Sequence, residues 1–262
     1  MPALEKPYSL SDRLDGRPPL DGAACRRHIP AVRTRAQTTG RLRATLATEP
    51  DASAVPEFGP DFRREFLDLL RWRRDVRRFR TDAIAPETIE RLLAIASLAP
   101  SVGLSQPWRF VLVDTPGCRA GILENFERCN AEALADYGGD RAALYARLKL
   151  SGLREAPCQF AVFADLSTSQ GAGLGRRTMP ATLEYSAVMA VHTLWLAARA
   201  EGIGLGWVSI LDPEAVCRLL DAPPDWKLVG YFCMGLPAEA SPTPELETRG
   251  WETRRLVSIL RR

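Results

Sequence analysis

Residues 181–200, which contain the longest apolar stretch of the chain at residues 188–200, constrain the fold more than any other feature of the sequence. Apolar side chains occupy nearly every side of the helix that this stretch predicts. A helix that is apolar all round is either buried in a protein core or embedded in a membrane. His192 and Arg199 interrupt the stretch, which leaves it too short and too polar to span a bilayer. We therefore expect a long central helix that is buried on all sides of a globular protein, without membrane contact.

Short apolar runs before and after this helix predict a sheet. The expected strands cover residues 110–113, 160–163, 207–210 and 228–234. Helical spacing of apolar residues and prolines at helix starts predict helices over residues 61–72, 86–99, 119–134, 141–150 and 213–220. Strands that are few, spread out and separated by helices are typical of an α+β protein with a central sheet flanked by helices.

Residues 1–60 differ in composition from the rest of the chain. They are rich in Arg, Pro, Ala and Thr and poor in aromatic residues and in periodic apolar patterns. Such a segment buries little surface on folding. We expect a variable, disordered arm over residues 1–60 and one folded domain over residues 61–262. The first residues lack the apolar core of a signal peptide, so the expected location is the cytoplasm.

Charge, cysteine and histidine content argue against several classes of function. The net charge of +3 is too small to indicate nucleic-acid binding. The six cysteines form no C-x-x-C pair, and the two histidines, His28 and His192, are far apart. Neither a metal site nor a Ser-His-Asp triad is therefore expected.

The densest charge run, residues 71–80, contains six arginines and one acid, Asp75. Arginine binds phosphate through a planar fork that donates two hydrogen bonds. The run follows an apolar helix and ends at Phe79, so the fold would hold it in place. It predicts an anion site, although a solvated helix end with scattered cations would have the same composition.

Two segments rich in Gly and Ser could line a ligand site. Residues 99–108 lie between a predicted helix and a predicted strand, where ligand contacts concentrate, and include Ser101, Gly103 and Gln106. Residues 202–210 hold three glycines and Ser209, which would extend a hydroxyl from an apolar strand. A plain helix-to-strand turn and packing glycines beside a buried serine are the structural alternatives.

Two further segments have roles that the sequence leaves open. The glycine-rich residues 171–177 lack the Lys-Ser/Thr ending of a P-loop and predict a flexible loop that could close over a ligand. Residues 250–255 either place a late cation near a phosphate or form a solvated tail.

Several motifs, in their order along the chain, resemble those of the nitroreductase superfamily. They are Arg73-Arg74-Asp75-Val76-Arg77, Ala99-Pro100-Ser101-Val102-Gly103, Gln106-Pro107-Trp108, residues 194–202 and Gly206-Trp207-Val208-Ser209-Ile210. The resemblance is strongest to the 5,6-dimethylbenzimidazole synthase branch, which residues 147–150 and 244–251 also match. It covers residues 61–255 and implies a nitroreductase-like fold, with a mixed or antiparallel central sheet, in a homodimer.

The resemblance also implies an unusual oxidoreductase reaction. FMN would lie at the subunit interface, and its reduced form would be consumed as the substrate. Molecular oxygen would react with it, and the ring system would be fragmented to 5,6-dimethylbenzimidazole, the lower ligand of vitamin B12. The sugar portion would leave as erythrose 4-phosphate. A flavin reductase or another source of reduced FMN would then be a partner.

The resemblance assigns a role to each matching residue. Asp75 and Ser209 match the two catalytic positions of the branch, with Asp75 as general base and Ser209 holding the flavin ring. Ordinary nitroreductases usually carry Ser where Asp75 stands, and a carboxylate can move the protons that ring fragmentation requires. The remaining residues that would bind FMN or shape its pocket are Arg73, Arg74, Val76, Arg77, Ser101, Gly103 and Leu148.

Two alternative functions use the same residues. An NAD(P)H-dependent nitroreductase would share the fold, but Asp75 and the absence of a clear nicotinamide-recognition signal argue against it. A non-catalytic flavin carrier would need the arginines and glycines, but not Asp75 together with Ser209.

Overall fold

The computed structural model describes residues 55–262. The arm expected over residues 1–60 lies almost entirely outside this range, so the domain boundary stays a prediction. The first described helix, α3 (Pro60–Trp72), starts with a proline in its first turn, where the ring cannot break a helical hydrogen bond. No residue of α3 is buried.

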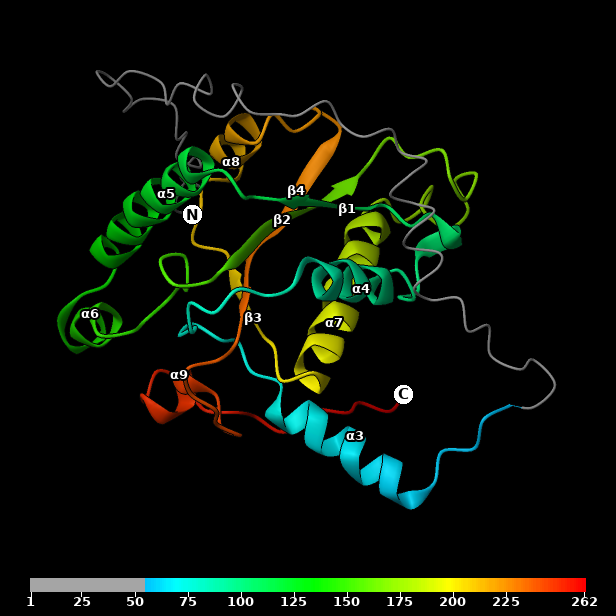
Figure 1. The fold of residues 1–262 in the computed structure, drawn as a ribbon, viewed down its shortest axis with the longest axis horizontal. Helices are drawn as coiled ribbons and strands as arrows, with labels where there is room; N and C mark the ends of the chain where they lie inside the picture. The colour runs from blue at the N-terminus through cyan, green and yellow to red at the C-terminus, as the bar shows by residue number, and fades with distance from the viewer. Residues whose placement is uncertain (1–54) are drawn as a thin grey trace, which may run out of the picture.

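A four-stranded antiparallel sheet forms the centre of the fold (Figure 1). Its strands, in the spatial order β1-β2-β4-β3, are β1 (Trp108–Leu112), β2 (Cys158–Asp165), β4 (Trp226–Gly235) and β3 (Gly204–Val208). Every neighbouring pair is antiparallel. The α+β class with a central antiparallel sheet is therefore confirmed.

Seven helices and one short 3-10 turn surround the sheet within residues 55–262. Besides α3 they are α4 (Pro86–Ala96), a 3-10 turn (Val102–Leu104), α5 (Pro116–Ala135), α6 (Gly139–Ala146), α7 (Thr182–Ala200), α8 (Pro213–Leu219) and α9 (Glu245–Thr248). Side chains cap two of them: Thr115 accepts a hydrogen bond at the start of α5, and Asp212 accepts two at the start of α8.

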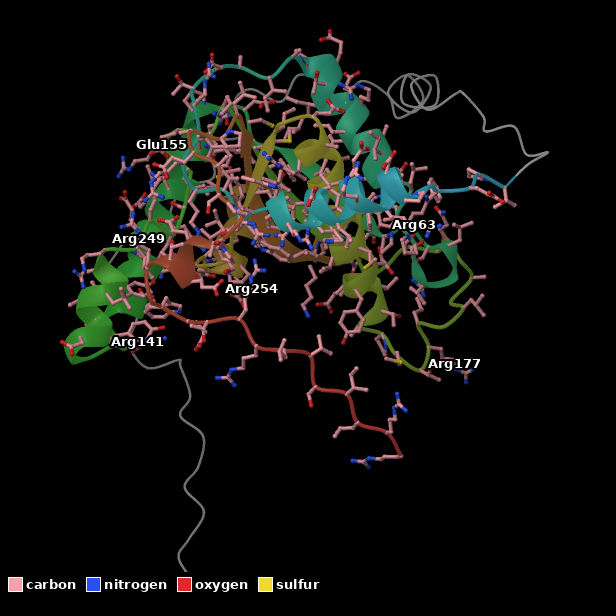
Figure 2. All side chains as sticks on the ribbon, turned by 90° about the horizontal axis from the view of Figure 1, so that it is seen from below. Arg63, Arg141, Glu155, Arg177, Arg249 and Arg254 are labelled. Atoms are coloured by element: carbon pink, nitrogen blue, oxygen red, sulfur yellow. The ribbon has the colours of Figure 1, made fainter. Side chains whose placement is uncertain are left out.

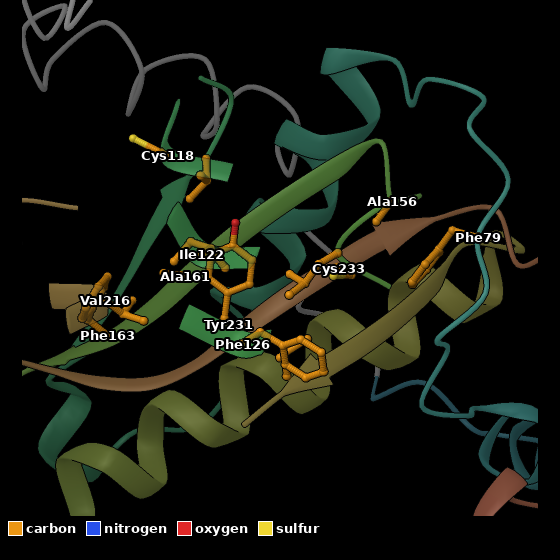
Figure 3. Close-up of a cluster of buried hydrophobic side chains, with 13 residues drawn as sticks. Phe79, Cys118, Ile122, Phe126, Ala156, Ala161, Phe163, Val216, Tyr231 and Cys233 are labelled. Atoms are coloured by element: carbon orange, nitrogen blue, oxygen red, sulfur yellow. The ribbon is translucent and has the colours of Figure 1, made fainter. Parts of the chain in front are cut away.

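Helices cover both faces of the sheet, and for this reason every residue of β2 is buried (Figure 1). Phe160 and Val162 pack on the face that carries α4 and α7. Ala161 and Phe163 alternate with them and pack on the face that carries α5 and α8. Figure 3 shows the hydrophobic cluster on the α5 face. Past α9, the chain continues as an extended segment to residue 262 (Figure 2).

The prediction that the central helix is buried on all sides is wrong. One face of α7, with Ala190 and Leu194, is fully buried against α4 and the sheet. The opposite face exposes Tyr185 by 58% and Met189 by 42%, with His192 also exposed. The sheet and α4 can cover only one side of a helix, and the described chain provides too little to cover the other.

The third strand ends earlier than its sequence predicts. It was expected over residues 207–210, whereas β3 ends at Val208, and Ser209 follows it as an exposed residue. Two of the three glycines of residues 202–210, Gly204 and Gly206, lie inside the strand. They have a structural role there, because a neighbouring segment passes close to the backbone of β3.

One acid at the end of β2 is held ionised by its neighbours. Asp165 accepts a hydrogen bond from the Arg109 guanidinium at 2.6 Å and two from Ser167, at 3.1 Å from the backbone and 2.8 Å from the hydroxyl. Burial opposes ionisation of this carboxyl, yet the hydrogen bonds from Ser167 and the charge of Arg109 outweigh it, and its pKa is lowered.

Among residues 55–262, no helix is long and apolar enough to cross a membrane.

Candidate active site

The segment that follows α3, residues 73–77, is called the arginine segment below. It lies along the edge strand β3, where Asp75 forms a parallel bridge with Leu205 and the Val76 N–H donates to the Leu205 carbonyl at 2.9 Å. Glycine at position 206 permits this approach, since a Cβ atom there would lie 2.0 Å from the Val76 carbonyl oxygen. The sheet edge therefore fixes the backbone of the arginine segment.

The Asp75 carboxylate is held on both oxygens. Its Oδ1 accepts a hydrogen bond from the Trp207 backbone N–H at 2.8 Å, and its Oδ2 accepts one from Arg77 Nε at 2.9 Å. Arg77 also donates to the Lys149 carbonyl at 3.2 Å. The Asp75 side chain is 31% exposed, so the carboxylate is fixed in direction and still reachable. A carboxylate in this state can accept further hydrogen bonds or a proton.

Tryptophan packs behind the two leading arginines. The Arg73 guanidinium carbon lies 5.1 Å from the centre of the Trp195 ring, and Trp195 Nε1 donates to the Arg74 carbonyl at 3.1 Å. A cation over an aromatic face is attracted by the ring quadrupole. Helix α7, which carries Trp195, thus orients the start of the arginine segment.

Arg74 is a partly buried cation, and one of its terminal nitrogens donates to the carbonyls of Leu70, at 3.4 Å, and Arg71. Its Nε is buried and has no hydrogen-bond partner in the described part of the chain. Burial lowers the pKa of Arg74, and the nearby charges of Arg254 and Arg73 lower it further, with Glu247 opposing them. A guanidinium whose protonation is opposed by two neighbouring guanidiniums lies where an anion is favoured.

A cavity of about 320 Å³ opens beside the arginine segment. This volume lies at the lower end of the range of small-molecule sites. Its lining brings together four of the predicted residues, Arg74, Asp75, Val76 and Arg77, with Trp72, Trp195 and residues of α9.

Two further predicted residues lie next to this group. Ser209 comes just after β3, two positions beyond the Trp207 N–H that binds Asp75. Leu148 is half-buried after α6 and lines a second cavity of about 170 Å³. Its neighbour Lys149 supplies the carbonyl that Arg77 binds, so Arg77 connects the Leu148 segment to Asp75.

Ser101 and Gly103 lie elsewhere, near the other end of α7. The Ser101 hydroxyl accepts from the Gln106 N–H at 3.1 Å, and the Val102 N–H donates to Ser186 Oγ of α7 at 3.0 Å. A side chain at Gly103 would meet the backbone of the glycine-rich loop that follows β2. Ser186 is nine residues before Trp195, which corresponds to roughly 13 Å along a helix. One copy of the chain thus holds the predicted residues in two separate groups.

Sequence reasoning missed several residues that shape this site. Trp207 contributes only its backbone N–H to Asp75, and a backbone contact leaves no signature in residue type. Arg78 binds Glu245 of α9 at 2.8 Å. In the sequence, nothing distinguished it from the other arginines of residues 71–80. The alternation of glycines at 204 and 206 was the signal available, since it indicates a strand that another backbone approaches closely.

In the part of the chain that the structure describes, no group of three or more His, Cys, Asp or Glu side chains could hold a metal ion.

The model of the nitroreductase family matches residues 70–236, more than half of the chain. The chain belongs to the nitroreductase family. Its nitroreductase-like fold is thereby confirmed, and the matched range contains the arginine segment and all strands of the sheet.

Curated members of the nitroreductase family are close in sequence. A protein of Rhodospirillum rubrum named 5,6-dimethylbenzimidazole synthase is 58% identical over 207 residues, which cover 79% of this chain and 98% of that protein. A Rhodobacter capsulatus protein of the same name is 51% identical over 195 residues, which cover 74% of this chain and 94% of that protein.

Solved structures of the same fold include proteins with a bound flavin. Iodotyrosine deiodinase, crystallised with FMN and 3-iodo-L-tyrosine, superposes with a TM-score of 0.59 at 26% identity and covers 74% of this chain and 97% of its own. A nitroreductase-fold protein of Exiguobacterium sibiricum in complex with FMN gives a TM-score of 0.55 at 16% identity. The superposition covers 73% of this chain and 93% of that protein.

Proposed function

We propose that this chain is a 5,6-dimethylbenzimidazole synthase that uses molecular oxygen to fragment reduced FMN into 5,6-dimethylbenzimidazole and erythrose 4-phosphate. The observation that carries the proposal is the Asp75 carboxylate, which the Trp207 N–H and Arg77 fix at the wall of the larger cavity. The names of the curated relatives, with up to 58% identity, support the same activity.

The residues at the site fit FMN. Its phosphate is a dianion that needs cationic donors, and Arg74 has a buried Nε without a partner beside Arg73 and Arg254. We assign the phosphate to these three guanidiniums. The cavity beside them is large enough for part of a flavin.

Bound reduced FMN would supply both the electrons for oxygen and the carbon skeleton of the product. Asp75 would accept a proton from the ribityl chain, because each of its oxygens makes one bond to the protein and keeps a further lone pair for the ligand. The bonds from Trp207 and Arg77 would keep that carboxylate in one orientation throughout. Ser209, exposed just after β3, would donate its hydroxyl to the flavin ring.

We infer that the working enzyme is a homodimer. Within one copy, Ser101 and Gly103 lie apart from Asp75, near the other end of α7, and a second copy would supply these residues from its own surface. The exposed apolar face of α7, with Tyr185 and Met189, is the surface that such a copy would cover. The expected setting is the cytoplasm, where a flavin reductase would provide reduced FMN.

The test exposes the purified full-length protein and chemically reduced FMN to air and measures 5,6-dimethylbenzimidazole by mass spectrometry. The wild type should form the product, and Asp75→Asn should bind FMN without forming it. The amide keeps an acceptor for the Trp207 N–H but cannot act as a base. An unchanged yield in Asp75→Asn would remove this residue from the mechanism. Rapid NADPH oxidation with a nitroaromatic, without the benzimidazole product, would instead indicate an ordinary nitroreductase.

A further inference from the structure

The C-terminal segment packs against α6 and the residues before it through a cluster of aromatic and cationic side chains. Trp251 makes an edge contact with Tyr137, with ring centres 5.5 Å apart, and a tilted contact with Tyr145 at 5.9 Å. The Arg141 guanidinium lies 3.7 Å from the centre of the Trp251 ring and donates to the Trp251 carbonyl at 2.9 Å. Trp251 is half-buried by these contacts. Aromatic edge contacts and a stacked guanidinium each add specific attraction to the burial of the ring.

The backbone on the other side of Trp251 is fixed to α9. Gly250 has a φ of +75°, and the Trp251 N–H turns back to the Leu246 carbonyl at 2.8 Å. Helix α9 is joined in turn to Arg78, the residue that follows the arginine segment, through an ion pair with Glu245 at 2.8 Å. Trp251 therefore lies where α6, α9 and the C-terminal segment meet.

Arg254 follows three residues later and is placed by this junction. Its Nε lies 3.6 Å from the Glu247 carboxylate of α9, and other residues of α9 line the same cavity as Arg74. Its charge also opposes protonation of Arg74 and lowers the Arg74 pKa. The ion pair with Glu247 is largely solvated, with 57% of the Arg254 side chain exposed, and such pairs hold a segment weakly. Beyond Trp251 the chain forms no helix or strand (Figure 2). The contacts of the Trp251 ring, together with the backbone bond from the Trp251 N–H to the Leu246 carbonyl, thus restrain where Arg254 lies.

We propose that Trp251, together with Arg141, is a positioning residue for the phosphate of FMN. The ring holds the C-terminal segment so that Arg254 stays near Arg74. The two guanidiniums are then already positioned for the phosphate before FMN binds. The inference rests on the proposed flavin function and adds a residue that need not touch the flavin. Without this restraint, the C-terminal segment must become ordered when the phosphate binds, which weakens binding. Only ligands with a phosphate are affected in this way.

Equilibrium binding of two flavins separates positioning from a general structural effect. Oxidised FMN and riboflavin, which lacks the phosphate, are titrated with the full-length protein and followed by flavin fluorescence. Trp251→Ala should weaken FMN binding about tenfold, the effect of one charge-assisted contact, and change riboflavin binding less than twofold. Trp251→Phe should restore most of the preference for FMN, because a ring still packs between Tyr137 and Tyr145.

Two surface variants keep the test decisive if Trp251→Ala folds poorly. Arg141→Gln removes the exposed cation over the ring and its hydrogen bond to the Trp251 carbonyl, and should lower the preference for FMN in the same direction, by a smaller factor. Arg218→Gln removes an exposed arginine of α8 and should leave both affinities unchanged. Equal weakening of the two flavins, or no weakening of either, would overturn the role of Trp251. A wild type that binds neither flavin would contradict the proposed function itself.

Discussion

Substitution of Gly206 by alanine should detach the arginine segment from the sheet. The added Cβ would lie 2.0 Å from the Val76 carbonyl oxygen, and real contacts of this kind are not closer than 3.0 Å, so the two backbones must separate by about 1 Å. That shift stretches the 2.9 Å bond from Val76 to Leu205 and the 2.8 Å bond from Trp207 to Asp75 beyond hydrogen-bond range. One neutral and one charge-assisted bond together amount to about 2–4 kcal/mol.

Urea denaturation of Gly206→Ala and the wild type measures this loss, and FMN titration measures its effect on the site. The variant should lose about 2–4 kcal/mol of unfolding free energy, together with measurable FMN affinity. Gly138→Ala is the control, because an added Cβ there meets nothing within 4 Å and its φ is −121°. As an N-cap change it should cost less than about 1 kcal/mol. A Gly206→Ala protein as stable as this control, with unchanged FMN affinity, would refute the argument.

Three further variants probe charge and pH. Arg77→Lys keeps the charge but loses the planar fork that donates to Asp75 from Nε and to the Lys149 carbonyl from a terminal nitrogen, so the product yield by mass spectrometry should fall by about tenfold; an unchanged yield would contradict this. Ser209→Ala, at an exposed position, should change the unfolding free energy by less than about 0.5 kcal/mol while lowering product yield, and a large stability loss would assign it a structural role. Asp165 has a lowered pKa in the folded protein, so it adds stability above the unfolded carboxyl pKa of about 3.9 and loses it as the pH falls through the folded value. The stability gap between the wild type and Asp165→Asn should therefore narrow below about pH 4, and a gap that does not depend on pH would count against it.

Local patterns in the sequence predicted most of the fold. Prolines marked the starts of α4 and α8, and apolar runs located every strand to within a few residues. The exposed face of α7 could not be predicted, because Tyr185 and Met189 are as apolar as the residues that face the sheet. Apolar character predicts that a residue avoids water, and it does not tell which side of a helix the rest of the described chain covers.

The candidate site was predicted in its residues but not in its connections. The arginine segment and β3 are about 130 positions apart, and the bond from Trp207 to Asp75 depends on a backbone group that any residue type carries. The place of Arg254 depends on contacts of Trp251 with a helix about 110 positions earlier. Contacts over such distances follow from the assembled fold, whereas residue type and spacing describe only the neighbourhood of each residue.

The mass balance of flavin tests the central claim most directly. A known quantity of chemically reduced FMN is exposed to air with the wild-type protein, and both the remaining FMN and the 5,6-dimethylbenzimidazole are quantified by mass spectrometry. An enzyme that consumes its flavin should lose one FMN for each benzimidazole formed. Full recovery of the flavin as intact oxidised FMN, with no benzimidazole, would contradict the account.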